Sequence, residues 1–182
     1  MSSIESSIPA VLGERARQQP DAPAYTFSDY ECDAAGFSTT LTWSEVHQRA
    51  QVVAAELASC GSAGDRVAIL APHDLNYIIG FLGAVEAGLI AVPLSAPQFG
   101  MERVVAALKD SAPVALLTTS EAVDAVDSCA QGLPGPLPAV IEIDALDFYA
   151  PAAFRSTDKP QNKTAMLQYT SGSTRAPTGV MI

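Results

Sequence analysis

Short apolar runs and helical spacings of apolar residues follow one another along most of this chain. Two runs without alternation, Val67–Leu70 and Leu89–Val92, predict strands that are buried on both faces. Between them, apolar residues recur every three or four positions, which predicts a helix with one apolar face. That face is formed by Leu75, Ile78, Ile79, Leu82 and Val85.

The same order of elements continues toward the C-terminus. Met101–Lys109 and Glu121–Ala130 have helical spacing, whereas Val114–Thr118 and Ala139–Ile143 are short apolar runs. Buried strands separated by helices are typical of a parallel sheet that is covered on both faces. The sequence therefore predicts an α/β fold in which helices are layered on a mostly parallel sheet.

The first sixty or so residues predict two helices and a hairpin. Residues 8–19 have helical spacing, and Ala24–Phe27 and Thr39–Thr42 fit two paired strands. Thr42-Trp-Ser-Glu45 fits a capping box, in which two side chains satisfy backbone donors at the start of a helix. Gly61 stands where a left-handed cap at the C-terminus of that helix is expected.

Composition excludes several classes of function. The formal net charge is −10, and an acidic surface repels phosphate backbones, so we expect no nucleic-acid partner. Leu75–Leu94 approaches the ~20 residues of a membrane span, but Glu86 lies inside it at a cost on the order of 3 kcal/mol. We therefore expect no integral membrane protein. The N-terminus lacks a basic region followed by an apolar run, which favours a cytoplasmic protein without a secretory signal.

Residues that often carry chemistry are scattered along this chain. Cys32, Cys60 and Cys129 have no metal-site spacing, and we expect them to be buried, reduced thiols. His47 and His73 have no set of acids or cysteines near them in sequence. We therefore expect structural roles for both histidines and predict no metal site.

A polar stretch near the C-terminus reads Tyr169-Thr-Ser-Gly-Ser-Thr-Arg-Ala-Pro-Thr-Gly179. Residues 150–164 fit a surface loop that leads into it, Ala165–Tyr169 predicts a strand before it, and Val180–Ile182 predicts a strand after it. Glycine lets the backbone approach an anion, and turn amides and hydroxyls donate hydrogen bonds to one. Composition leaves two interpretations open, which are a phosphate cradle and an ordinary flexible turn.

This stretch is not a Walker A loop, which needs G-x-x-x-x-G-K-[ST] followed by a helix. Gly172 and Gly179 have a different spacing, and neither is followed by lysine. Both flanks predict strands. A phosphate site at this position would therefore rest on a strand–turn–strand unit.

Several motifs of the chain resemble, in the same order, those of the acyl-adenylate-forming, or AMP-binding, enzymes. YTSGSTRAPTGV is similar to their phosphate-loop motif, [YF]-T-S-G-[ST]-T-G-x-P-K-G-V. Leu41–Val46 resembles their L-T-Y-x-E-L, Gly64–Ala68 their G-D-R-V-A, and Phe81–Leu94 their early core segment ending in P-L. The resemblance covers essentially the whole chain. It implies that residues 1–182 are the N-terminal part of an AMP-binding domain, with its phosphate-loop motif at 169–180.

Two departures from the common motif indicate one branch of the superfamily. Arg175 stands where most members have glycine, and Thr178 stands where most have lysine. The resulting S-G-S-T-R-x-P resembles the fatty acyl-AMP ligases. By position, this resemblance implies a set of residues at the ATP phosphates, with Arg175 as a hypothetical replacement for the missing lysine charge. The other members of the set are Thr170, Ser171, Gly172, Ser173 and Thr174.

The resemblance implies an ATP-dependent acid ligase. Fatty acyl-AMP ligases convert a long-chain fatty acid and ATP, with Mg²⁺, into acyl-AMP and pyrophosphate. They pass the acyl group to an acyl carrier domain of a polyketide synthase for the synthesis of complex lipids. Two alternatives stay open, which are an acyl-CoA ligase of the same fold and a non-catalytic remnant or interaction module.

Members of this family are several times longer than 182 residues. The adenine- and ribose-binding segments, the glutamate associated with magnesium, and the lid with the family's catalytic lysine have no counterpart in this chain. Adenylation depends on positioning and charge stabilisation by the whole site, so we expect a fragment or truncated form that makes no acyl-adenylate alone. We also expect exposed apolar surface where the rest of the sheet would pack.

Overall fold

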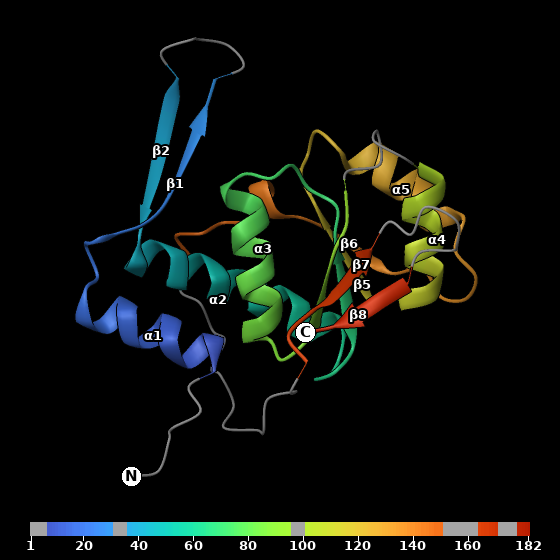
Figure 1. The fold of residues 1–182 in the computed structure, drawn as a ribbon, viewed down its shortest axis with the longest axis horizontal. Coiled ribbons are helices and arrows are strands. Elements are labelled where there is room, and N and C mark those ends of the chain that lie inside the picture. The colour runs from blue at the N-terminus through green and yellow to red at the C-terminus, as the bar shows by residue number, and fades with distance from the viewer. Residues whose placement is uncertain (1–6, 31–35, 96–100, 151–163, 171–177) are drawn as a thin grey trace.

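The computed structural model describes residues 7–30, 36–95, 101–150, 164–170 and 178–182. Figure 1 shows a central sheet with helices on both sides and a long hairpin, β1–β2, that extends away from it. The described part of the chain therefore has the layered α/β fold that the apolar pattern predicts.

Four parallel strands form the central sheet, in the order β4-β3-β5-β6. Each strand coincides with one of the apolar runs to within one residue at either end, so the predicted parallel sheet is confirmed. The strands are β3 (Arg66–Ile69), β4 (Ile90–Pro93), β5 (Ala115–Thr118) and β6 (Ala139–Glu142).

Helices cover both faces of this sheet (Figure 1). One side holds α2 and α3 with α1 beside them, and the other side holds α4 and α5. A short 3₁₀ turn, Ile143–Ala145, follows β6. The helices are α1 (Ile8–Gln18), α2 (Trp43–Cys60), α3 (Leu75–Glu86), α4 (Met101–Ser111) and α5 (Val123–Gln131).

The sheet separates two hydrophobic cores. Along β3 and the residue after it, Val67 and Ile69 pack with α2 and α3, whereas Ala68 and Leu70 pack with α4 and α5. All four side chains are fully buried. Because both faces are covered, the strands contain apolar residues without polar alternation.

The N-terminal hairpin consists of β1 (Pro23–Asp29) and β2 (Phe37–Thr42), which pair antiparallel as predicted. The capping box that follows is also confirmed. Thr42 Oγ1 accepts a hydrogen bond from the Glu45 amide at 3.3 Å, and the Thr42 amide donates to Glu45 Oε2 at 2.8 Å. The turn from β2 into α2 thus satisfies its backbone donors locally.

The prediction of a left-handed cap at Gly61 is wrong. Its backbone is extended, with φ −160° and ψ −179°. Glycine is needed here for close approach, because a Cβ at this position would lie 2.7 Å from Cγ2 of Val114. The chain therefore leaves α2 in close contact with Val114, the residue that precedes β5.

The apolar segment Leu75–Leu94 is divided between a helix and a strand. Helix α3 ends at Glu86, Gly88 turns the chain with φ +76°, and β4 begins at Ile90. Within the part of the chain that the structure describes, no helix is both long and apolar enough to cross a membrane.

A second hairpin, β7–β8, joins the edge of the sheet. Strands β7 (Leu167–Thr170) and β8 (Thr178–Met181) confirm the strands predicted on either side of the polar stretch, and the structure shows that they pair antiparallel. The start of the hairpin is parallel to β4 at the bridge between Ala91 and Met166. Its apolar side chains Val180, Met181 and Ile182 are exposed, which matches the expected exposed apolar surface.

Candidate nucleotide-phosphate site

The polar stretch of the sequence spans the β7–β8 hairpin. Tyr169 pairs with Gly179, and Thr170 pairs with Thr178, so the structure brings together the two ends of the predicted phosphate loop. Among the predicted phosphate-contacting residues, Thr170 is the last residue of β7. The remaining ones, Ser171, Gly172, Ser173, Thr174 and Arg175, lie outside the described residues, as does almost all of the predicted surface loop at 150–164.

Tyr169 connects this hairpin to helix α4. Its hydroxyl donates a hydrogen bond to Oδ2 of Asp110 at 2.6 Å. Its ring lies across Gly179, where an added Cβ would sit 3.2 Å from Cζ of the tyrosine. Gly179 therefore leaves the space in which the ring lies. The sequence reasoning assigned Tyr169 no such role, although it is the first residue of the quoted motif.

The electrostatic surroundings of Tyr169 favour its neutral form. Burial raises the pKa of Tyr169 to about 12, and the hydrogen bond to Asp110 and the carboxylate charge act in the same direction. The Ser111 hydroxyl and the positive charge of Arg66 oppose this shift in pKa. The hydroxyl therefore keeps its proton, and remains a donor to Asp110, throughout the physiological pH range.

Arg66 holds the end of α4 from the side of β3. Its Nε donates to the carbonyl oxygen of Ser111 at 2.7 Å, and one terminal nitrogen donates to the carbonyl of Ala112 at 3.4 Å. Ala112 has φ +43°, in the left-handed region that often ends a helix. A cation at the C-terminus of a helix also interacts favourably with the helix dipole. The last turn of α4 thus contacts both β3 and β7.

The end of the hairpin farther from the polar turn is bound by backbone groups. The Ala91 amide of β4 donates to the Ala165 carbonyl at 3.0 Å, and the Ala165 amide donates to the Ile182 carbonyl at 2.8 Å. Met166 and Ile182 exchange a further pair of hydrogen bonds, of 3.2 and 3.0 Å. Backbone contacts therefore secure one end of the hairpin, and the Tyr169 side chain secures the other.

Neither histidine belongs to this hairpin, and His47 and His73 lie in and just before helices of the α2–α3 layer. His47 is half-buried on α2, and burial lowers its pKa. His73 makes an edge contact with Tyr77, with ring centroids 4.7 Å apart. The described residues contain no group of three or more His, Cys, Asp or Glu that could hold a metal ion. They supply no ligand set of this kind for magnesium.

The predicted state of the cysteines needs one correction. Cys129 is free and buried, as expected. Cys60 is free but only half-buried, because it lies at the end of α2 next to the extended Gly61. Its sulfur contacts the Glu56 carbonyl one turn back at 3.5 Å. Cys32 lies outside the described residues.

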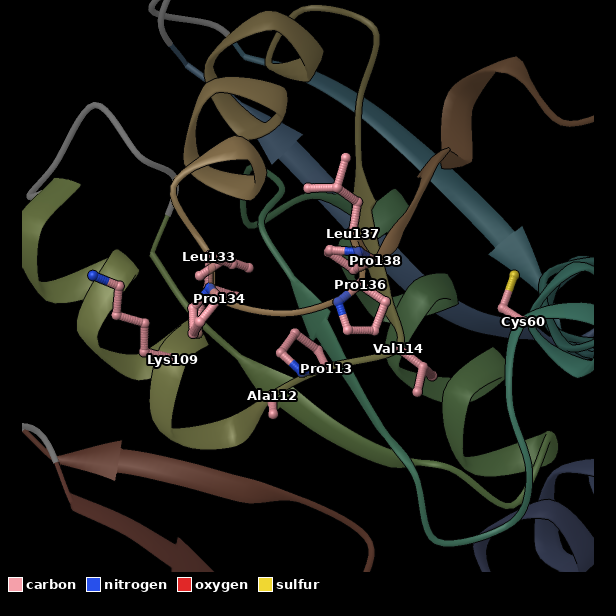
Figure 2. Close-up of a pocket in the computed structure, with 11 residues that line it drawn as sticks. Cys60, Lys109, Ala112, Pro113, Val114, Leu133, Pro134, Pro136, Leu137 and Pro138 are labelled. Carbon is pink, nitrogen blue, oxygen red and sulfur yellow. The ribbon is translucent and has the colours of Figure 1, made fainter.

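A shallow hollow of about 310 Å³ lies between the end of α4 and the proline-rich connector that precedes β6. Figure 2 shows Pro113, Pro134, Pro136 and Pro138 grouped around it, while the Lys109 side chain extends away from these prolines. Binding sites combine apolar walls with a few convergent polar groups. The lining of this hollow lacks such a group, so we assign it no ligand.

Comparison with known proteins places the chain in a family. The family model described as AMP-binding enzyme matches residues 12–182. The chain therefore belongs to the AMP-binding enzyme family, as its motifs predict. The match includes both strands of the β7–β8 hairpin.

Two curated relatives are identical to this chain at about half of the aligned residues. The long-chain-fatty-acid–AMP ligase FadD26 of Mycobacterium tuberculosis is 51% identical over 185 residues, which cover 100% of this chain and 32% of that protein. A 4-hydroxyphenylalkanoate adenylyltransferase of the same species is also 51% identical, over 98% of this chain and 30% of that protein. The predicted resemblance to the fatty acyl-AMP ligase branch is thus confirmed. The chain spans about a third of the length of these relatives.

Solved structures give the same result. A fatty acid AMP ligase from Legionella pneumophila superimposes with a TM-score of 0.82 and 30% identity, over 97% of this chain and 30% of that one. A fatty acyl-adenylate ligase from the same species, in complex with acyl adenylate and pyrophosphate, gives a TM-score of 0.81 at 30% identity. A fatty acyl CoA synthetase of M. tuberculosis has a TM-score of 0.70 at 23% identity, which shows a shared fold alone.

Proposed function

We propose that this chain serves as the phosphate-binding part of a fatty acyl-AMP ligase. In that reaction a carboxylate oxygen of a long-chain fatty acid attacks the α-phosphorus of ATP. The bond between the α-phosphorus and the bridging oxygen breaks, and pyrophosphate leaves with the electron pair. The observation that carries this proposal is the antiparallel pairing of Thr170 with Thr178, which brings together the two ends of the hydroxyl-rich stretch.

Within the proposed site, the turn supplies hydrogen-bond donors to the phosphates. The hydroxyls of Thr170, Ser171, Ser173 and Thr174 donate to phosphate oxygens, and Gly172 leaves room for the backbone to approach. Hydrogen bonds to charged groups contribute ~1.5–3 kcal/mol each, so several of them could hold a triphosphate without lysine. Arg175 adds a positive charge, which at ~4 Å from a phosphate contributes up to roughly 4 kcal/mol at an effective dielectric of 20.

The remaining assignments also follow the resemblance and belong to this proposal. ATP and Mg²⁺ are the proposed cofactors, although the described residues give magnesium no ligand set. A long-chain fatty acid is the substrate, and an acyl carrier domain of a polyketide synthase receives the acyl group in the cytoplasm. The 51% identity to the long-chain-fatty-acid–AMP ligase FadD26 supports this branch.

A second acid substrate is favoured by one observation. The 4-hydroxyphenylalkanoate adenylyltransferase is as similar to this chain, at 51% identity, as FadD26 is. Residues 1–182 therefore do not distinguish an aliphatic acid from an arylalkanoic acid. An acyl-CoA ligase has weaker support, since the fatty acyl CoA synthetase shares only 23% identity.

A chimera tests the proposed reaction. Residues 1–182 would replace the matching third of M. tuberculosis FadD26, and acyl-AMP would be measured with a long-chain fatty acid, with 4-hydroxyphenylalkanoate, and with coenzyme A added. We expect acyl-AMP and no acyl-CoA. A folded chimera that releases no acyl-AMP, or that releases acyl-CoA, would contradict the proposal.

The chain by itself provides a second test. We expect no ATP–pyrophosphate exchange stimulated by a long-chain fatty acid, because adenylation needs charge stabilisation from the whole site. Exchange above the level without fatty acid would overturn this expectation.

A further inference from the structure

We infer that Tyr169 and Asp110 form a positioning pair that fixes the end of β7, the strand that leads into the proposed phosphate-binding residues, relative to helix α4. The inference rests on the proposed function, because it assigns a role to the residue that immediately precedes the turn. Neither residue would touch the nucleotide. Their hydrogen bond, 2.6 Å long, would act through the strand that carries Thr170.

The hairpin needs such a support. Two-stranded hairpins are marginally stable by themselves. At the end of β7–β8 that is farther from the turn, the Ala91 amide of β4 donates to the Ala165 carbonyl, and the bonds of Ala165 and Met166 to Ile182 join the two strands to each other. At the end nearer the turn, the hydrogen bond from Tyr169 to Asp110 links the described residues of the hairpin to the body of the protein.

Asp110, which accepts this hydrogen bond, is held at the end of α4. Asp110 lies in the last turn of α4, where a carboxylate is unfavourable because of the helix dipole. The Tyr169 hydroxyl donates to this carboxylate and offsets part of the cost, and Arg66 binds the helix end beside it through the Ser111 carbonyl at 2.7 Å. The carboxylate is therefore held on the side of α4 that faces the hairpin.

Gly179 completes the arrangement on the other strand. It pairs with Tyr169, and an added Cβ would lie 3.2 Å from Cζ and 3.4 Å from the hydroxyl oxygen of the tyrosine. A methyl group there must displace the ring by a few tenths of an ångström. The position of the hydroxyl, and hence the hydrogen bond to Asp110, depends on a residue without a side chain.

Pyrophosphate is the probe for the test, and the protein is the 182-residue chain. Tyr169→Phe removes the hydrogen bond and keeps the ring. We expect the Kd for pyrophosphate to rise roughly 3- to 10-fold, which is part of the effect of a hydrogen bond to a charged group. The free energy of unfolding should also fall, because the same hydroxyl contributes to stability, so each Kd is measured under conditions in which both proteins are fully folded. Tyr149→Phe, at a side chain that is 90% exposed, is the matched control and should leave the Kd unchanged.

Variants of the partner residue separate positioning from a general loss of structure. Asp110→Asn keeps an acceptor oxygen and should retain most of the affinity, whereas Asp110→Ala should match Tyr169→Phe. The double variant Tyr169→Phe/Asp110→Ala should be no weaker than either single variant, because both remove the same interaction. Gly179→Ala should also weaken binding, with the Tyr169 hydroxyl still present.

The outcomes distinguish this inference from the proposed function. If the unmodified chain does not bind pyrophosphate, the phosphate-binding role and the positioning role both fall. If it binds and Tyr169→Phe binds equally tightly, only the positioning role falls. An additive double variant, or an Asp110→Asn variant as weak as Asp110→Ala, would also overturn the positioning role.

Discussion

Gly83 of α3 faces Val53 of α2 with no room for a methyl group between the helices. A Cβ added at Gly83 would lie 2.6 Å from Cβ of Val53 and 3.1 Å from the Ala50 carbonyl oxygen. Val53 and Ala50 are fully buried. The close contact between the two helices on this face of the sheet therefore depends on a glycine in the middle of a helix.

Gly83→Ala should destabilise the protein despite the better helix propensity of alanine. Overpacking a well-packed core costs about 1–3 kcal/mol, which exceeds the gain of about 0.5–1 kcal/mol from replacing a helical glycine. Urea unfolding followed by circular dichroism would measure this change.

Gly13→Ala on α1 is the matched control. An added Cβ there would contact Nε2 of His47 at 3.6 Å, an ordinary van der Waals distance. We expect this variant to raise the free energy of unfolding by about 0.5–1 kcal/mol. Equal effects of the two substitutions would contradict the account of the helix contact.

Glu86 should make stability depend on pH in the weakly acidic range. Its side chain is only 5% exposed, its Oε2 has no hydrogen-bond partner among the residues that the structure describes, and burial raises its pKa above 4.5. The folded state therefore binds a proton more tightly than the unfolded state. The contribution of Glu86 to the free energy of unfolding is fully present below pH 4.5 and is lost as the pH rises through the folded-state pKa.

Glu86→Gln should remove this loss. At pH 7 we expect the melting temperature to rise by about 2–4 °C, the shift that about 1 kcal/mol produces in a chain of this size. Near pH 4 the two proteins should melt alike. The exposed Glu56→Gln serves as control, and a Glu86→Gln advantage that does not grow between pH 4 and pH 7 would refute the explanation.

Tyr169 should make stability depend on pH in the alkaline range. Because the pKa of Tyr169 is raised from 10.0 to about 12, its contribution to stability is complete below pH 10 and disappears as the pH rises toward 12. The difference in unfolding free energy between the unmodified chain and Tyr169→Phe should therefore shrink over that interval. A constant difference between pH 10 and pH 12 would show that the hydroxyl is not held as described.

Sequence patterns predicted the parts of the fold that depend on neighbouring residues. The capping box at Thr42 and Glu45 involves residues three positions apart, and the buried strands follow from continuous apolar runs. The left-handed cap predicted at Gly61 is wrong, since this glycine provides space beside Val114, which is distant in sequence.

In the candidate site, too, the sequence predicted the local structure and not the contacts between distant residues. The motif itself predicted the strand–turn–strand unit that β7 and β8 form around the polar turn. The contact between Tyr169 and Asp110 joins residues 59 positions apart, and that between Arg66 and Ser111 joins residues 45 apart. No local pattern marks such pairs, because they form only when β7 and β3 approach the end of α4.

The most direct test of the central claim is the affinity of the 182-residue chain for ATP, measured by calorimetry beside adenosine and beside the Arg175→Ala variant. If residues 169–179 hold the phosphates, the chain should bind ATP and not adenosine. The variant should raise the Kd for ATP about 10-fold or more, since a charge close to a phosphate contributes up to roughly 4 kcal/mol. Equal affinity of the two proteins for ATP, or equal affinity for ATP and adenosine, would contradict the account.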